Sequence, residues 1–315
     1  MLSRHFLRAK VLQQLYSCMM SGNKDVALAE QDLLEGIEQT YKLQVYIYSA
    51  TLEIRDIAEN QIEEAKTKFF PTEEELNPNM RFVTNPLFAR LQENIELNKA
   101  VEKLKINWVE QKDMLKNIFN RFKDSDSYKK YMALENCTFE DHRKVVILMM
   151  KNYLLKNESF LDFLFEKQLY WESDFLFVGL TYLNYLKDYE EDALPHKPLF
   201  QMFDEKTDDR KAFAVDLLTK TLAHYDEYDE LFRKHVENWD MDRLAFLDRI
   251  IIKMGITELL YCPNIPVRVT MNEYIELAKE FSTERSKLFV NGLLDGFLID
   301  RRAEGRIVEE DIDSE

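Results

Sequence analysis

The stretch Lys287-Leu-Phe-Val-Asn-Gly-Leu-Leu-Asp-Gly-Phe-Leu-Ile-Asp300 decides the fold class of this chain. Its large apolar residues recur as adjacent pairs every four residues, which is the period of one face of an α-helix. The dipeptide Asn291-Gly292 is typical of a hairpin turn, but the apolar period continues through it. We therefore expect a helix over residues 285–301, in which Gly292 lets a neighbouring helix pack closely. The apolar face consists of Phe289, Val290, Leu293, Leu294, Phe297 and Leu298.

The rest of the chain has the same helical texture. Only 7 glycines and 7 prolines occur in 315 residues, fewer than the usual rate of roughly 7% and 5%. So few helix breakers favour long helices joined by short loops over sheets and barrels. We expect an all-α helical bundle, and the apolar periodicity predicts helices over residues 4–20, 33–69, 213–225, 244–260 and 269–281, with further helices between 87 and 189.

The charge of the chain is negative but unevenly distributed. The net charge is -16, whereas proteins that bind nucleic acids are usually basic, because phosphate contacts supply most of their affinity. Residues 1–24 nevertheless contain Arg4, Arg8, Lys10 and Lys24 and no acidic residue. A small basic patch at the N-terminus is therefore expected to bind a polyanion that the remaining surface repels.

The sequence carries none of the motifs that mark the common enzyme classes. It has no glycine-rich phosphate loop and no H-E-x-x-H pair, and its 58 acidic residues single out no acid/base couple. The longest apolar run, residues 145–150, is far short of the roughly 20 residues that cross a bilayer. Cys18, Cys137 and Cys262 lie far apart, which is typical of reduced thiols. We expect a cytoplasmic protein that is not an enzyme and that holds no metal or cofactor.

Three C-terminal segments form a continuous signature: Asp242–Leu259, Ile265–Phe281 and Lys287–Asp295. With the arginine-containing run Arg4–Tyr16, they resemble the NusB family of transcription antitermination factors. In that family a proline-containing loop precedes an N-E-x-I-E-L-A-K helix, and the next helix carries F-V-N-G-x-L-D. The resemblance covers about residues 1–20 and 209–301, and its C-terminal part is the more specific.

The resemblance implies an RNA-binding factor of transcription antitermination and elongation. It implies boxA-like leader and ribosomal RNA as ligand, a NusE-type small-subunit ribosomal protein as partner, and indirect contact with the RNA polymerase elongation complex. His5 and Phe6 stand where further arginines are common in the family, so we expect weak binding without the partner. The positions implied to contact the partner are Tyr16 and Asp248, and those implied to contact RNA are Arg4, His5, Arg8, Lys10, Tyr16, Arg249, Ser286 and Phe289.

The chain is much longer than a typical member of this family, which implies an insertion. We expect N-terminal helices of a NusB-like domain over residues 1–61, a helical insertion over 62–203, a C-terminal bundle over 204–301 and an acidic tail over 302–315. Within the bundle we expect Asn272 and Glu273 to open a helix, with Thr270 capping the amide of Glu273.

Two other functions compete with RNA binding. One is a helical scaffold for protein interactions that kept the fold and lost RNA binding, which the charge of -16 favours. The other is an RNA-modifying enzyme, since NusB-like domains precede some ribosomal RNA cytosine methyltransferases. No glycine-rich motif for a methyl donor follows residue 301, which argues against the enzyme. For Phe289, stacking on an unpaired base and burial in the core both remain open.

Overall fold

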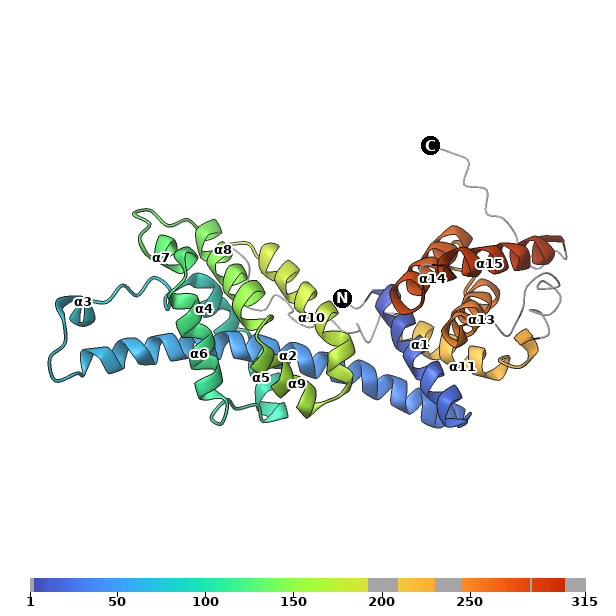
Figure 1. Cartoon of the computed structure of the whole chain (residues 1–315), viewed down its shortest axis with the longest axis horizontal. Coiled ribbons are helices and arrows are strands. Elements are labelled where there is room, and N and C mark those ends of the chain that lie inside the picture. The colour runs from blue at the N-terminus through green and yellow to red at the C-terminus, as the bar shows by residue number, and fades with distance from the viewer. Residues whose placement is uncertain (1–2, 192–208, 230–244, 284, 304–315) are drawn as a thin grey trace. The chain divides into compact units, whose positions relative to one another are not determined.

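The computed structural model describes residues 3–191, 209–229, 245–283 and 285–303 (Figure 1). These residues form helices, and no strand occurs among them, which confirms the predicted all-α fold. The acidic stretch 304–315 and the turn around Trp239 lie outside the described residues.

Within the described ranges, no helix combines the length and the apolar character that spanning a bilayer requires.

The chain divides into two compact units. We call residues Met1–Ile37 and Met202–Glu315 the terminal unit and residues Glu38–Gln201 the middle unit. Helix α2 (Val26–Lys66) contains residues of both. The predicted start of the insertion, residue 62, lies inside α2 and after the first part of the middle unit's apolar core, which begins at Leu43. The functional separateness of the insertion remains a prediction.

Five described helices and the first part of α2 build the terminal unit. Helix α1 packs against α11 and α13, and α13, α14 and α15 pack against one another. Helix α1 begins where the Ser3 side chain accepts a hydrogen bond of 3.1 Å from the Phe6 amide, and it ends at Gly22 in the left-handed conformation, φ 68°. The bounds are α1 Arg4–Ser21, α11 Arg210–Ala223, α13 Phe246–Tyr261, α14 Val267–Phe281 and α15 Ser286–Ala303.

The close helix packing predicted for Gly292 belongs to Gly255 instead. A Cβ atom at Gly255 would lie 2.9 and 3.0 Å from the δ-carbons of Leu294 and 3.4 Å from the Tyr274 ring. A Cβ atom at Gly292 would meet nothing within 4 Å. The glycine that lets α13 approach α14 and α15 therefore lies in the apolar helix α13, and the prediction for Gly292 was wrong.

Helix α14 also begins earlier than predicted. Pro266 precedes its first residue, Val267, so Asn272 and Glu273 lie within the helix. Thr270 is buried, and its hydroxyl donates to the Glu258 carboxylate at 2.9 Å. Its role is to satisfy a buried carboxylate rather than to cap a helix.

The middle unit consists of the remaining part of α2 and a series of shorter helices (Figure 1). Most of them begin at a Ser, Thr or Asn whose side chain accepts a backbone N–H of the first turn, namely at Thr72, Asn85, Asn94, Ser125, Thr138 and Asn157. The bounds are α3 Glu73–Leu76, α4 Pro86–Gln92, α5 Ile95–Leu104, α6 Lys112–Lys123, α7 Asp126–Met132, α8 Phe139–Met149, the π-helical η1 Met150–Leu154, α9 Glu158–Lys167 and α10 Tyr170–Lys187.

The middle unit has its own hydrophobic core. A cluster of buried apolar residues runs from Leu43 to Leu186 and includes residues of α2, α4, α6, α8 and α10. Two buried polar links complete it: the Thr40 hydroxyl donates to Asp174 at 2.6 Å, and the Trp171 indole donates to the Gln39 carbonyl at 2.9 Å. All of these residues lie between 38 and 201, so the unit packs around residues of its own.

Candidate nucleic-acid interface

Helices α1 and α13 run antiparallel, and this arrangement divides the predicted site residues into two groups. Arg8 of α1 contacts Glu258 near the end of α13, whereas Tyr16 contacts Phe246 at the start of α13. The eight residues from Arg8 to Tyr16 span about 12 Å of helix at 1.5 Å per residue. One group therefore lies at the N-terminal half of α1 and the other at its C-terminal half.

Arg8 belongs to a buried ion pair. Its side chain is 1% exposed, its Nε donates to Glu258 Oε2 at 2.7 Å, and its Nη2 donates to Glu258 Oε1 at 2.6 Å. Glu258 is also buried, and its carboxylate accepts further hydrogen bonds of 2.9 Å from Thr270 and from Tyr274. Four donors thus satisfy the carboxylate, as a buried charge requires.

A second carboxylate completes the surroundings of Arg8. Its Nη1 donates to Glu273 Oε2 at 2.9 Å. Burial alone would lower the pKa of Arg8, but the hydrogen bond and charge of Glu258, with the charge of Glu273, outweigh it and raise the pKa. A guanidinium enclosed in this way is not open to a phosphate. The structure therefore assigns Arg8 to the packing of α1 on α13 and α14, contrary to the RNA contact expected from the sequence.

Lys10 is also buried, contrary to the same expectation. Only 4% of Lys10 is exposed, and its ammonium lies 5.5 Å from the centroid of the Phe6 ring, one helical turn earlier. An RNA phosphate cannot reach a side chain in this position without displacing α1 from the core.

Arg4 and His5 lie closer to solvent. Arg4 Nη2 pairs with Asp209 Oδ2 at 2.7 Å, and its guanidinium carbon lies 5.7 Å from the centroid of the Phe213 ring. His5 lies between two carboxylates of α14, with Nδ1 2.9 Å from Glu273 and Nε2 3.2 Å from Glu280. Arg4, paired with Asp209, and Lys24, paired with Asp226, are thus the cations of the predicted patch that can exchange an exposed carboxylate for a phosphate.

Lys211 is a further cation, outside the set of residues predicted from the sequence. It is exposed in the first turn of α11, two residues from Asp209, the partner of Arg4. Its side chain makes no ion pair among the described residues. The sequence does contain a signal for an exposed cation here, because the run Asp209-Arg-Lys211 directly precedes the apolar period of α11. The backbone groups of the first turn of a helix are open to solvent.

At the other end of α1, two aromatic rings are exposed together. Tyr16 of α1 and Phe246 of α13 meet edge to face, with ring centroids 5.7 Å apart. Both are among the exposed large apolar side chains of the terminal unit. Exposed rings of this kind can stack on an unpaired base or fill a pocket of a protein partner.

Asp248 and Ser286 are brought together in the interior. The Ser286 hydroxyl donates to Asp248 Oδ2 at 2.8 Å, and both residues are buried. This bond joins the start of α15 to the first turn of α13. Direct contact of Asp248 with a partner, or of Ser286 with RNA, is not available in this arrangement.

Arg249 and Phe289 complete the predicted set. Arg249 is half-buried, and its Nη2 lies 3.3 Å from Asp229 Oδ1. Phe289 is half-buried near the start of α15. Among the described residues, no group of three or more His, Cys, Asp or Glu side chains is placed to hold a metal ion. The described site residues that lie at the surface are cations and aromatic rings.

The family model described as "NusB family" matches residues 177–298. The "Transcription antitermination protein NusB" of Bacillus subtilis (strain 168) is 43% identical over 97 residues, which is 31% of this chain and 72% of the relative. The proteins of the same name from Salinibacter ruber and Myxococcus xanthus are 43% identical over 95 residues and 46% identical over 87 residues. Those segments are 30% and 28% of this chain.

The chain spans 59% and 62% of the lengths of the Salinibacter and Myxococcus relatives. No solved structure matches the chain. The family model covers the second half of α10 in the middle unit, and α11, α13, α14 and most of α15 in the terminal unit. Through this match, and through the coverage of most of the Bacillus relative, the chain belongs to the NusB family.

Proposed function

We propose that this protein is an RNA-binding transcription antitermination and elongation factor. It binds boxA-like leader and ribosomal RNA together with a NusE-type small-subunit ribosomal protein. The RNA polymerase elongation complex then contacts this assembly indirectly. It acts by holding RNA beside its partner, and no covalent bond changes. The observation that carries this proposal is the match to the NusB family over residues 177–298.

The surface proposed for RNA differs from the sequence-based set. Lys211 supplies an exposed cation at the start of α11, and Arg4 supplies a partly exposed one near the N-terminal end of α1. Arg8 and Lys10 are buried and support the helix from within. Tyr16 and Phe246 supply the exposed rings at the other end of α1. The twelve residues from Arg4 to Tyr16 span about 18 Å of helix, so we propose that a single strand contacts the cations and the protein partner covers the rings.

The test is a fluorescence anisotropy titration of a labelled boxA-like RNA at 50 and 150 mM salt, with and without the NusE-type protein. Because Arg8 and Lys10 of the predicted patch are buried and the net charge is -16, the chain alone should bind weakly at 150 mM salt. The partner should tighten binding at least tenfold, or about 1.4 kcal/mol. If the mixture binds no better than its stronger component, cooperative recognition is wrong.

Single variants locate the RNA surface. Arg4→Ala and Lys211→Ala should each weaken binding and reduce the salt slope by about 1. The matched control is Lys116→Ala, which removes an exposed lysine of the middle unit that makes no ion pair among the described residues. A control variant that lowers the slope equally would place the RNA elsewhere.

One observation favours the scaffold as a second candidate. Of the three cations predicted for RNA near the N-terminus, Arg8 and Lys10 are buried. A NusB-type bundle in which two of these three cations are buried can bind a protein partner without RNA. Binding of the NusE-type protein at micromolar concentration, with no RNA binding at 50 mM salt by the complex, would establish this alternative.

A further inference from the structure

The middle unit carries an exposed aromatic pair at the end of α2. Phe69 and Phe70 are 90% and 84% exposed, and their ring centroids lie 4.7 Å apart. Leu76 of α3 is also exposed. We call these three side chains the aromatic tip. Exposed apolar side chains that lie close together mark interaction sites more often than single exposed apolar residues do.

The chain on either side of the two rings is fixed. Lys68 pairs with Glu75. The Thr72 amide donates to Glu75 Oε2 at 2.8 Å, and the Glu75 amide donates to Thr72 Oγ1 at 3.2 Å, which forms a capping box at the start of α3. Phe69 and Phe70 lie between Lys68 and Thr72 and next to Pro71. Their backbone is therefore organised before any partner binds, which lowers the entropic cost of binding.

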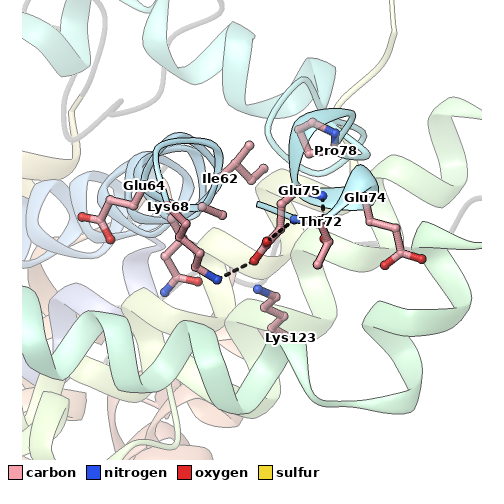
Figure 2. A pocket seen from close by; sticks show the side chains of 10 residues that line it. Ile62, Glu64, Lys68, Thr72, Glu74, Glu75, Pro78 and Lys123 are labelled. Carbon is pink, nitrogen blue, oxygen red and sulfur yellow. Dashed lines mark hydrogen bonds and ion pairs between the residues drawn. The ribbon is translucent and has the colours of Figure 1, made fainter. Parts of the chain in front are cut away.

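A cavity adjoins the tip. It has a volume of about 560 Å³ and is lined by residues of α2, α3 and α6 and of the segments on either side of α3. In Figure 2 the Lys123 ammonium points toward the Lys68–Glu75 pair, and Glu64 and Glu74 lie on opposite sides of it. The side chains of Glu64, Glu74 and Lys123 make no ion pair with any described residue.

The charge around the tip is negative. The Lys68–Glu75 pair is neutral as a whole. The remaining charges are three carboxylates and one ammonium, which leave a local charge of about -2. The carboxylates belong to Glu64, Glu73 and Glu74, and the ammonium belongs to Lys123. Carboxylates at this density repel the phosphates of RNA and the same surface of a second copy, whereas they attract lysine and arginine side chains.

We propose that the aromatic tip is a docking surface for a basic protein partner, one that presents an apolar pocket edged with lysine or arginine. The Phe69 and Phe70 rings enter the pocket, and Glu64, Glu73 and Glu74 pair with its basic edge. An aromatic side chain buries about 150–250 Å², so the two rings form the centre of a small, transient interface. This surface is independent of the RNA surface proposed above.

The test uses the full-length protein and a fluorescent helical peptide in which lysines flank both edges of a leucine face, so that the leucines can contact the rings while the lysines reach the carboxylates. Anisotropy titrations at 50 and 150 mM salt should show binding that Phe69→Ala/Phe70→Ala weakens at least tenfold. The variant should keep the melting temperature of the wild type, because both rings are exposed. Glu64→Gln/Glu73→Gln/Glu74→Gln should weaken binding at 50 mM salt and reduce its salt dependence.

The matched control is Leu176→Ala/Leu180→Ala, which removes two exposed leucines of α10. It should bind the peptide as the wild type does, and a peptide with glutamate in place of lysine should bind at least tenfold more weakly. Equal loss in the control variant, or equal binding of the acidic peptide, would overturn the proposal. So would a dimer, seen by light scattering, that Phe69→Ala/Phe70→Ala dissociates. The boxA titration of the same variant should match the wild type, so failure here is distinct from failure of the RNA proposal.

Discussion

Gly255 lies where a Cβ atom would come within 2.9 Å of Leu294. Because Leu294 is fully buried, it cannot move aside freely, and overpacking of this kind costs about 1–3 kcal/mol. The gain in helix propensity from alanine offsets about 1 kcal/mol of that cost. We expect Gly255→Ala to lower the free energy of unfolding by about 1 kcal/mol, measured by urea denaturation.

Gly292→Ala is its internal control. The added methyl meets nothing within 4 Å, so only the propensity gain remains, and we expect an increase of about 0.5–1 kcal/mol. The two variants should therefore change stability in opposite directions. Equal effects would mean that α13 does not depend on a glycine for its close approach to α15.

Glu258 is the carboxylate on which the Arg8 cluster depends. Glu258→Gln removes the charge that compensates Arg8, whose side chain is buried with it, and loss of one partner of a buried pair costs about 3–5 kcal/mol. Glu273→Gln should cost less, because Glu273 is partly exposed and offers Arg8 one bond. Urea denaturation of both variants checks this order, and a reversed order would contradict it.

Cys262 provides a test that depends on pH. Burial, with the charge of Glu258, raises the pKa of the Cys262 thiol to about 11. The thiolate reacts with iodoacetamide, so alkylation at Cys262 should be slow at pH 8 and rise about tenfold per pH unit. Since the folded state holds this proton more tightly, its contribution to stability is present below the ordinary pKa of cysteine and is lost as the pH rises toward 11. Mass spectrometry of the alkylated peptide measures the rate, and a plateau near pH 9 would contradict the burial.

The residue scale also shows what the sequence conceals. The first 24 residues contain no acid, so Arg8 reads as a free cation, yet its carboxylate partners are 250 and 265 positions away. Asp248 and Ser286 likewise look polar and available, and they satisfy each other in the interior. Burial and pairing between distant helices cannot be obtained from local charge, and four of the nine predicted site residues lie buried, namely Arg8, Lys10, Asp248 and Ser286.

At the scale of helices, α13 and α15 are joined by the bond from Ser286 to Asp248 Oδ2 at 2.8 Å. Asp248 Oδ1 has no hydrogen-bond partner, so Ser286→Ala would leave the buried carboxylate without this donor. An unsatisfied buried group costs about 1–3 kcal/mol, more when charged. We expect that loss in urea denaturation, together with faster amide exchange in the first turn of α15.

Ser282→Ala is the control for this prediction. Its hydroxyl also contacts Ser286, at 3.0 Å, but the bond to Asp248 does not depend on it. Its effect should stay within about 0.5 kcal/mol. Equal losses would mean that the serine cluster, rather than the carboxylate, holds α15 in place.

The helices themselves were largely predictable, because an apolar face with a period near 3.6 marks each of them. Helices α11, α13, α14 and α15 begin and end within three residues of their predicted bounds. Asn272 and Glu273 were predicted to open α14 because Thr270 resembles a capping residue in sequence, whereas Pro266 precedes the first residue of the helix in the structure. A local capping pattern cannot reveal that Glu258 recruits the Thr270 hydroxyl.

For the whole molecule, the position of the second core matters most. The buried cluster of the middle unit begins with Leu43, Val45, Ile47 and Tyr48 of α2. A fragment spanning Glu38–Gln201 contains that entire cluster, and we expect it to be helical and to melt cooperatively. A fragment of residues 62–203 lacks the α2 residues and should melt at a lower temperature with less cooperativity. Circular dichroism on both fragments decides between the two boundaries.

The length of the chain predicts an additional helical region, but it does not predict where that region begins. Pro71, Pro78 and Pro86 mark a break in the sequence, whereas the division falls after Ile37 inside the continuous helix α2. A helix that serves two cores carries apolar residues along its whole length, so its sequence gives no sign of where one core ends.

The Arg8–Glu258 pair also has a consequence for biosynthesis. The two residues are 250 positions apart, and at about 5–20 residues per second the ribosome needs about 12–50 s to travel from one codon to the other. During this interval every residue of the middle unit is synthesised, while α1 lacks the carboxylate that neutralises Arg8. The nascent middle unit should therefore gain protease resistance first, and α1 should become protected only after α13 and α14 have left the exit tunnel.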